Sequence, residues 1–212
     1  MDIIIYNAMK YLKLFESLDN IHEICKRYDI ENYTINSDGS IDVDGNVDIQ
    51  DRKLTKLPLK FRNVSGSFDC KYNKLTSLEG SSTYVGSTFI CSYNKLTNLE
   101  GSPTRVGGTF HCSNNSLTSL KGGPTSVGGD FYSRNNNLTS LEDFQTHLGG
   151  DFYCSINPVY KIWELFYDTS KIELFNDYDI IRGTDIVIDR LNDFLITIGK
   201  DPVESVKGYN NI

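Results

Sequence analysis

The segment FICSYNKLTNLEGSPTRVGGTF, residues 89–110, spans one full unit of an internal repeat and decides the fold of this chain. Its phenylalanine, cysteine, asparagine and two leucines each recur at steps of 21 residues. These five columns are Phe68, Phe89, Phe110, Phe131 and Phe152; Cys70, Cys91, Cys112, Ser133 and Cys154; Asn73, Asn94, Asn115, Asn136 and Asn157; Leu54, Leu75, Leu96, Leu117 and Leu138; and Leu57, Leu78, Leu99, Leu120 and Leu141. A degenerate earlier copy begins near Val43, where Val47 and Ile49 take the phenylalanine and cysteine positions. The repeat predicts about six coils over residues 43–162, above the minimum of about three for a continuous core.

The spacing within one unit predicts how each coil folds. Phenylalanine and cysteine lie two residues apart, so both side chains point to the same face of a short strand. The leucines of a pair lie three residues apart, which suits a turn or a short helical wrap. A single coil buries too little apolar surface to fold alone, whereas stacked coils share one core. We therefore predict an α/β repeat solenoid with a parallel sheet, roughly 30 Å long at ~4.8 Å per strand.

Asparagine, glycine and cysteine have distinct predicted roles. The asparagine column is expected to hydrogen-bond the backbone of successive coils. The alternative role of this column is a row of polar side chains that binds a ligand. The glycine pairs at 107–108, 128–129 and 149–150 are expected to allow a positive φ before the strand, and a following strand disfavours a phosphate-binding loop. The cysteine column is expected to pack in the core, because its spacing does not suit zinc. The opposite bend is marked by Gly80, Gly101 and Gly122, with Pro103 and Pro124.

Residues 1–42 are the predicted first cap, because a stacked array exposes apolar faces at both ends. Apolar side chains recur here at helical spacing, an extended piece at 33–35 follows, and residues 38–39 (Asp-Gly) predict a turn into the first strand of the array. His22 lies among the apolar residues and is interpreted as a core or boundary histidine rather than a ligand. The helical positions are Leu14, Leu18, Ile21, His22 and Cys25.

Residues 163–212 are the predicted second cap. An amphipathic helix is expected from Ile186 to Ile196, with Gly199 as its C-terminal stop and Pro202 just beyond. A large apolar cap also suits a subunit interface, so a homodimer is left open. The large apolar side chains before the helix are Trp163, Leu165, Phe166, Ile172 and Phe175.

Composition and charge exclude several classes of protein. The 212 residues carry a net charge of −7, with the acidic excess in the two flanks, which argues against a general nucleic-acid binder. No stretch approaches the ~18 unbroken apolar residues of a membrane span. The start, MDIIIYNAMKYLKLF, lacks the basic beginning and apolar run of a secretory signal, and five cysteines do not suggest a disulfide framework. We therefore expect a cytoplasmic protein with no cofactor or metal site and no membrane partner.

Residues that alternate with the phenylalanine and cysteine columns are expected to form the exposed face of the sheet. This face varies from coil to coil while the core columns stay the same. Tyrosine and arginine are enriched where binding energy concentrates, and Arg134 is able to grip a phosphate or carboxylate with two parallel bonds. The alternative is an ordinary solvated sheet face with β-forming tyrosines. The candidate binding residues are Tyr72, Ile90, Tyr93, His111, Asp130, Tyr132, Arg134, Asp151 and Tyr153.

The quoted segment resembles leucine-rich repeats, whose core pattern is LxLxxNxLxxL. Here phenylalanine takes the first leucine and cysteine the second. The pattern departs upstream, where Val85 precedes Phe89 by four residues, while ordinary leucine-rich repeats space that pair by three. The wording LTSLEGxPxxVGGxFxC is similar to leucine-rich-repeat-like proteins encoded by tailed bacteriophages and other environmental viruses. The resemblance implies a viral protein that acts in the cytoplasm of a bacterial host, and it implies no particular ligand.

Three classes of function follow. The first is a non-catalytic binding protein that captures a host partner and interferes with host physiology or defence; the partner is a protein, or a small nucleotide-like signal in a pocket completed by a cap or second subunit. The second is an enzyme, which is disfavoured because strand alternation sends His111 and Cys112 to opposite faces, leaving only Asp130 and Asp151 as a candidate carboxylate or cation pair. The third is a virion or assembly component, which a short capped array disfavours.

Overall fold

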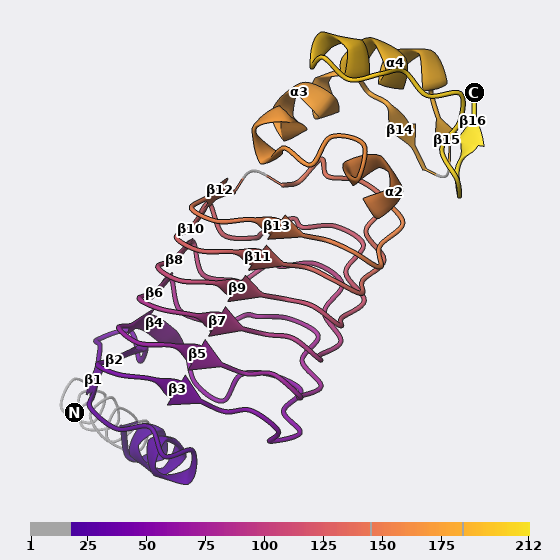
Figure 1. The fold of residues 1–212 in the computed structure, drawn as a ribbon. Helices are drawn as coiled ribbons and strands as arrows, with labels where there is room; N and C mark the ends of the chain where they lie inside the picture. The colour runs from indigo at the N-terminus through magenta and orange to yellow at the C-terminus, as the bar shows by residue number, and fades with distance from the viewer. Residues whose placement is uncertain (1–17, 145, 184) are drawn as a thin grey trace, which may run out of the picture.

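The computed structural model describes residues 18–144, 146–183 and 185–212 of the chain. It has an α/β arrangement, in which parallel sheets dominate and the few helices lie before and after them (Figure 1). The middle of the chain runs in stacked coils, each of which adds one short strand to each of two sheets. Within the described residues, no helix has both the length and the apolar character needed to cross a membrane.

The six-stranded sheet carries the phenylalanine column. Its strand order is β13-β11-β9-β7-β5-β3, and every neighbouring pair is parallel. Each phenylalanine pairs with the phenylalanine 21 residues away, and Val47 pairs with Phe68, which confirms the degenerate first copy. The strands are β3 (Val47–Asp48), β5 (Phe68–Asp69), β7 (Phe89–Ile90), β9 (Phe110–His111), β11 (Phe131–Tyr132) and β13 (Phe152–Tyr153).

A second, seven-stranded sheet corrects the prediction of one parallel sheet. It forms because the valine four residues before four of the phenylalanines, such as Val85, is also buried in a short parallel strand, and Leu148 takes this position before Phe152. Its first two strands are antiparallel, and the turn between them contains Gly39 at φ 77°, which confirms the predicted turn. The strands are β1 (Tyr33–Ile35), β2 (Ile41–Val43), β4 (Phe61–Val64), β6 (Tyr84–Val85), β8 (Arg105–Val106), β10 (Ser126–Val127) and β12 (His147–Leu148).

The asparagine column joins the coils as predicted. In Asn115, Nδ2 donates to the carbonyl of Cys112 in its own coil at 3.0 Å and to that of Cys91 in the preceding coil at 3.1 Å. Its Oδ1 accepts from the backbone N–H of Leu96 at 3.1 Å. Each such asparagine satisfies backbone groups that the bend leaves without sheet partners. The side chains of the phenylalanine, cysteine and leucine columns between the two sheets are buried, apart from the partly buried Leu54.

The glycine pairs act differently from the prediction, because none of them has a positive φ. A β-carbon built on Gly107 would lie 2.2 Å from the carbonyl oxygen of Gly86 in the preceding coil. Glycine is therefore required there by the close approach of two backbones. Positive φ occurs instead at Gly80, Gly101 and Gly122, which lie in the predicted opposite bend. The leucine pairs lie in irregular segments of the chain, and no helical wrap forms in the described coils.

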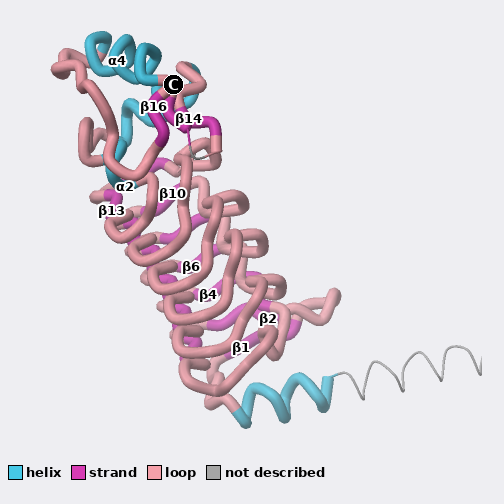
Figure 2. The backbone as a smooth tube through the Cα atoms, turned by 90° about the vertical axis from the view of Figure 1, so that its right-hand side faces the viewer, coloured by secondary structure: helices cyan, strands magenta, loops and turns pink. Residues whose placement is uncertain are grey.

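Helical segments flank the stacked coils at both ends (Figure 2). Before them, residues 18–27 form a helix that buries Ile21 and Cys25, whereas its exposed His22 is not a core residue. Leu14 and the other residues up to 17 lie outside the described part of the chain.

The segment after the coils contains α2 (Tyr160–Trp163), η1 (Thr169–Lys171), α3 (Ile172–Asp177), β14 (Ile181–Arg182), β15 (Asp185–Ile186), α4 (Ile188–Thr197) and β16 (Asn210–Asn211). Trp163 packs edge-on against Phe152 of the last coil, with ring centroids 5.2 Å apart. The predicted helix at 186–196 begins later, because Ile186 pairs with β14 and β16 in a small sheet. Gly199 follows it at φ 75°.

Candidate functional site

The outward side of the six-stranded sheet is formed by the second residue of each strand. These residues pair in register from coil to coil, so that Ile90 lies beside His111, and Tyr132 beside Tyr153. Their phenylalanine neighbours point the other way into the core, which confirms the predicted alternation. The outward row is Asp48, Asp69, Ile90, His111, Tyr132 and Tyr153.

Three rings of this row, those of His111, Tyr132 and Tyr153, form a continuous stack that we call the aromatic ladder. His111 and Tyr132 have ring centroids 4.5 Å apart and planes 3° from parallel. Tyr132 and Tyr153 follow at 4.6 Å and 8°. The ring spacing is close to the ~4.8 Å between paired strands, so the register of the sheet places the rings in a stack. The structure therefore brings three of the predicted site residues into one continuous surface.

Two carboxylates fix the tyrosine rings of the aromatic ladder. The hydroxyl of Tyr132 donates to Asp130 Oδ2 at 3.0 Å, and that of Tyr153 donates to Asp151 Oδ2 at 3.2 Å. Asp130 Oδ1 accepts from the backbone N–H of Asp151 at 2.8 Å. That N–H and the Tyr132 hydroxyl hold the pKa of Asp130 below its ordinary value. Each oxygen of Asp130 thus accepts one hydrogen bond, and Asp130 and Asp151 each hold the hydroxyl of one tyrosine of the aromatic ladder.

Arg134 lies beside the aromatic ladder. Its guanidinium carbon is 4.9 Å from the ring centroid of Tyr153 and 5.6 Å from that of Tyr132. Because the two rings are 4.6 Å apart, these distances place the cation alongside both rings rather than beyond the outer face of Tyr153. No carboxylate in the described residues lies within 4.0 Å of Arg134. Its N–H donors are accordingly positioned for a partner.

Tyr72 and Tyr93 stand apart from the aromatic ladder and form a pair of their own. Their rings stack with centroids 4.5 Å apart. Each lies three residues after the end of its strand, at a bend where φ is 56° in Tyr72 and 57° in Tyr93. From the sequence they are grouped with the exposed face of the sheet, although an even spacing from the phenylalanine column does not place them there by strand alternation. The left-handed backbone at this position was not expected, because only Asn114 and Asn135 in the same column hinted at it.

The cysteine column provides no nucleophile. Burial raises the pKa of Cys70, Cys91 and Cys112, so their thiols stay protonated. Cys112 Sγ donates to the carbonyl of Tyr132 at 3.3 Å, inside the core, whereas His111 faces outward. Among the residues described, no three His, Cys, Asp or Glu side chains gather closely enough to hold a metal ion.

A cleft of about 300 Å³ lies at the end of the aromatic ladder. Tyr153 and Asp151 line one side, and Trp163, Tyr167 and Asp168 of the following segment line the other. The last three residues were not among the candidates, because nothing in the repeat relates residues after 162 to the sheet. Only the fold shows that Tyr167, which is 58% exposed, borders the same surface.

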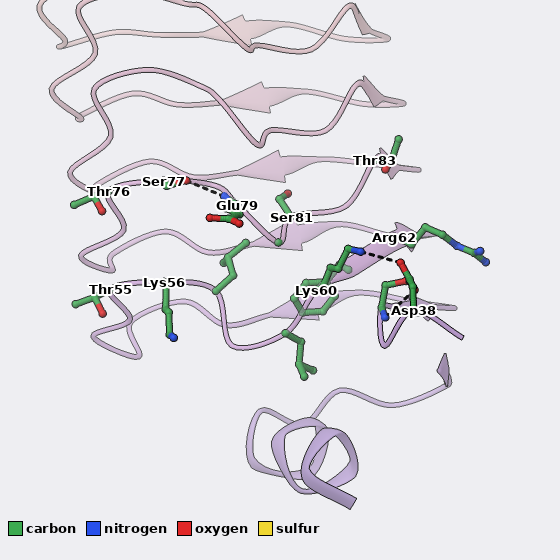
Figure 3. Close-up of a pocket in the computed structure, with 15 residues that line it drawn as sticks. Asp38, Thr55, Lys56, Lys60, Arg62, Thr76, Ser77, Glu79, Ser81 and Thr83 are labelled. Carbon is green, nitrogen blue, oxygen red and sulfur yellow. Dashed lines mark hydrogen bonds and ion pairs between the residues drawn. The ribbon is translucent and has the colours of Figure 1, made fainter. Parts of the chain in front are cut away.

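A larger cavity, of about 680 Å³, lies at the opposite end of the coils (Figure 3). Its polar side chains do not converge on one point. Lys60 Nζ is turned to Asp38 at 2.8 Å, and Arg62 bonds to Asp42. Thr55 and Thr76 lie at the far side of the coils from Arg62. This cavity is therefore a weaker candidate site than the aromatic ladder.

Comparisons with models of protein families, with curated proteins and with solved structures each gave no match. The interpretation of this surface therefore rests on its geometry.

Proposed function

We propose that this chain is a leucine-rich-repeat-like solenoid with a helical cap at each end, and that it acts as a non-catalytic binding protein. In this proposal the face of the six-stranded sheet captures a protein partner. The observation that carries the proposal is the aromatic ladder with Arg134 beside it. Tyrosine and arginine supply most of the energy at many protein interfaces, and an extended sheet face suits a large partner.

The geometry of the aromatic ladder favours a protein over a nucleotide-like ligand on this face. Its rings stack on each other at 4.5 Å and 4.6 Å, so no planar group fits between them. The face therefore exposes the edges of the rings and the guanidinium of Arg134 to a partner. A protein surface is able to lie across such edges. The rings lose little side-chain entropy on binding, because stacking and the bonds to Asp130 and Asp151 already fix them.

The resemblance to repeat proteins of tailed bacteriophages supports a bacterial host protein as the partner. The proposed role is to occupy that protein and so interfere with host physiology or defence. An interface of the usual size needs about 800 Å² on each side. The aromatic ladder supplies the centre of such an area, and the residues around the cleft at its end extend it.

The test combines Tyr132→Ala, Tyr153→Ala and Arg134→Ala in one variant. The matched control is Tyr84→Ala with Arg105→Ala, since these residues form a similar cation–π pair, at 5.8 Å, on the seven-stranded sheet. We expect the wild-type protein and the control to capture the same host protein from lysate, which mass spectrometry identifies. Binding of that purified protein to the triple variant should be at least about 30-fold weaker, as at an interface hot spot. Equal capture by all three proteins would refute the proposed surface.

A further inference from the structure

In every coil, one position in the turn after the strand has a left-handed backbone, and these equivalent positions form a column. The values of φ range from 50° to 60° along it. Asparagine and aspartate tolerate this conformation, whereas a bulky side chain is strained there. The column is Asp51, Tyr72, Tyr93, Asn114, Asn135 and Ile156. Two neighbouring coils thus carry tyrosine where the next two carry asparagine.

Tyr72 and Tyr93 adopt a left-handed backbone that is unfavourable for tyrosine, and packing in the core does not compensate for it. Tyr72 and Tyr93 are 49% and 46% exposed, so their rings do not fill the core. Residues held in such strained conformations cluster at functional sites. The stacking between the two rings explains their mutual order but not the choice of tyrosine in a position that asparagine suits better.

Tyr93 and Asn114 occupy the same position in consecutive coils, so a large ring lies next to a smaller side chain. The two residues share the same φ and lie in consecutive coils, where Tyr93 N donates to the carbonyl of Ser113, the residue before Asn114, at 3.1 Å. Asparagine is shorter than tyrosine, so the outer part of the Tyr93 ring extends beyond it on that side. Asn114 Oδ1 accepts from Asn135 Nδ2 at 2.8 Å, and within the described residues its own amide N–H groups donate to nothing. The face of the Tyr93 ring and the two amide N–H donors of Asn114 therefore lie at one place on the surface, which we call the corner.

The surroundings of this corner are basic. Residues 49–99 contain eight lysines and arginines and three acids, a net charge of +5 in a chain of −7. Lys53, Lys74 and Lys95 form a column two residues after the left-handed one, and all three are exposed. No carboxylate among the described residues lies within 4.0 Å of them. Stacked like charges repel, and an anion relieves that repulsion.

We propose that this corner binds a nucleobase joined to phosphate, with the base stacked on Tyr93 over Asn114 and the phosphate on the lysine column. A free nucleotide and a single-stranded nucleic acid share this chemistry. Base–aromatic stacking with flanking cations is the usual means of holding single strands. The overall charge of −7 opposes non-specific binding, but the positive charge here is local. The inference uses none of the residues of the aromatic ladder and stands independently of the proposed function.

The experiment measures fluorescence anisotropy of fluorescein-labelled dT12 and rU12 with the full chain at low salt. Asparagine is native to this column, so Tyr72→Asn with Tyr93→Asn removes the rings and keeps the turn. We expect binding about tenfold weaker or more for that variant, from the loss of stacking. Tyr84→Asn is the matched control, because Tyr84 is also exposed but lies on the seven-stranded sheet beside Asn63, and this variant should bind as wild type does.

Charge is tested separately from stacking. Lys74→Gln with Lys95→Gln should reduce the magnitude of the slope of log K against log salt by about 1.4. Each of the two lost phosphate contacts on a single strand accounts for ~0.7 of this change. Lys161→Gln with Lys200→Gln is the control and should leave the slope unchanged. Thymidine monophosphate that displaces dT12 at similar concentration would identify a free nucleotide as the ligand, and weaker displacement would identify the single strand.

Three results would overturn the inference. The first is no binding of either oligonucleotide by wild type. The second is equal affinity of wild type and the tyrosine variant. The third is displacement of dT12 by tripolyphosphate or polyglutamate as readily as by unlabelled dT12, since charge alone would then explain the binding and an acidic peptide would be the better partner.

Discussion

The carbonyl oxygen of Gly107 lies 2.1 Å from the position that a β-carbon on Gly128 would take. The same relationship links Gly128 to Gly149, at 2.2 Å. Neighbouring coils are thus in direct backbone contact at this bend, with no side chain between them. The first glycine of each pair is required by the neighbouring coil and not by its own φ.

Gly128→Ala should therefore lower the free energy of unfolding. The methyl group forces two backbones apart, and overpacking of this kind costs about 1–3 kcal/mol. Gly108→Ala is the matched control, because its nearest atom would lie 3.0 Å away, so a smaller loss is expected. Urea denaturation followed by circular dichroism measures both. Equal stability of Gly128→Ala and wild type would show that the coils separate there without cost.

The asparagine column should be far more sensitive than its exposed neighbours. Asn136 donates to Ser133 O at 2.9 Å and Cys112 O at 3.2 Å, and it accepts from Leu117 N at 3.0 Å. Asn136→Ala leaves these buried backbone groups unpaired, at about 1–3 kcal/mol for each unsatisfied group. Asn137→Ala, at an exposed position, should change the unfolding free energy little. A similar effect of both substitutions on the urea midpoint would contradict the bridging role.

The sequence predicts the repeated part of the fold well because a fixed period of 21 residues constrains each column in the same way. Phe89 and Phe110 occupy equivalent positions, so one argument places both. The sequence does not predict the second sheet, because a strand such as Tyr84–Val85 has one buried residue, without a second recurring apolar residue two positions away like the phenylalanine and cysteine of the first sheet. The prediction of a positive φ for the glycine pairs is wrong, because contact between coils depends on how closely they stack, and no local pattern encodes that distance.

The buried cysteines should be inert in the folded protein. Burial raises the pKa of Cys154 to about 12, which leaves roughly one thiolate in ten thousand at pH 8. All five cysteines are buried and free. Ellman's reagent at pH 8 should therefore modify them only after denaturant is added, when all five react. Rapid modification of one or more thiols in native buffer would show that the protein opens locally around them.

Stability should fall as the pH drops below about 6.5, through His111. Burial lowers the pKa of His111 in the fold, although the carboxylates of Asp130 and Asp69 oppose the effect and Lys71 adds to it. The unfolded chain therefore takes up a proton before the folded one does. The stabilisation is present above the unfolded pKa and is lost as the pH falls towards the folded pKa.

His111→Phe keeps a ring beside Tyr132 and removes the titration. The variant should show a flatter dependence of melting temperature on pH between 7 and 5 than wild type does. His147→Gln, at an exposed position, serves as the control and should retain the wild-type slope. An unchanged slope in His111→Phe would mean that other groups set the pH dependence in this range.

The candidate site was predictable in part. Strand alternation placed His111, Tyr132 and Tyr153 on one face, and the 21-residue step placed them in one row. Their stacking follows from the strand spacing once that row is known. The hydroxyl contacts of Asp130, the position of Arg134 along the rings and the cleft with Tyr167 depend on side-chain conformations and on a segment outside the repeat, which the period does not constrain.

The asparagine bridges also bear on how such a gene changes length. Because each bridge uses the same groups in every coil, duplication of 63 nucleotides adds a coil that its neighbours accept without adjustment. Each duplication lengthens the outward row by one position that mutation is free to vary. A lineage can therefore alter the reach and chemistry of its recognition surface by copying, while the architecture stays intact.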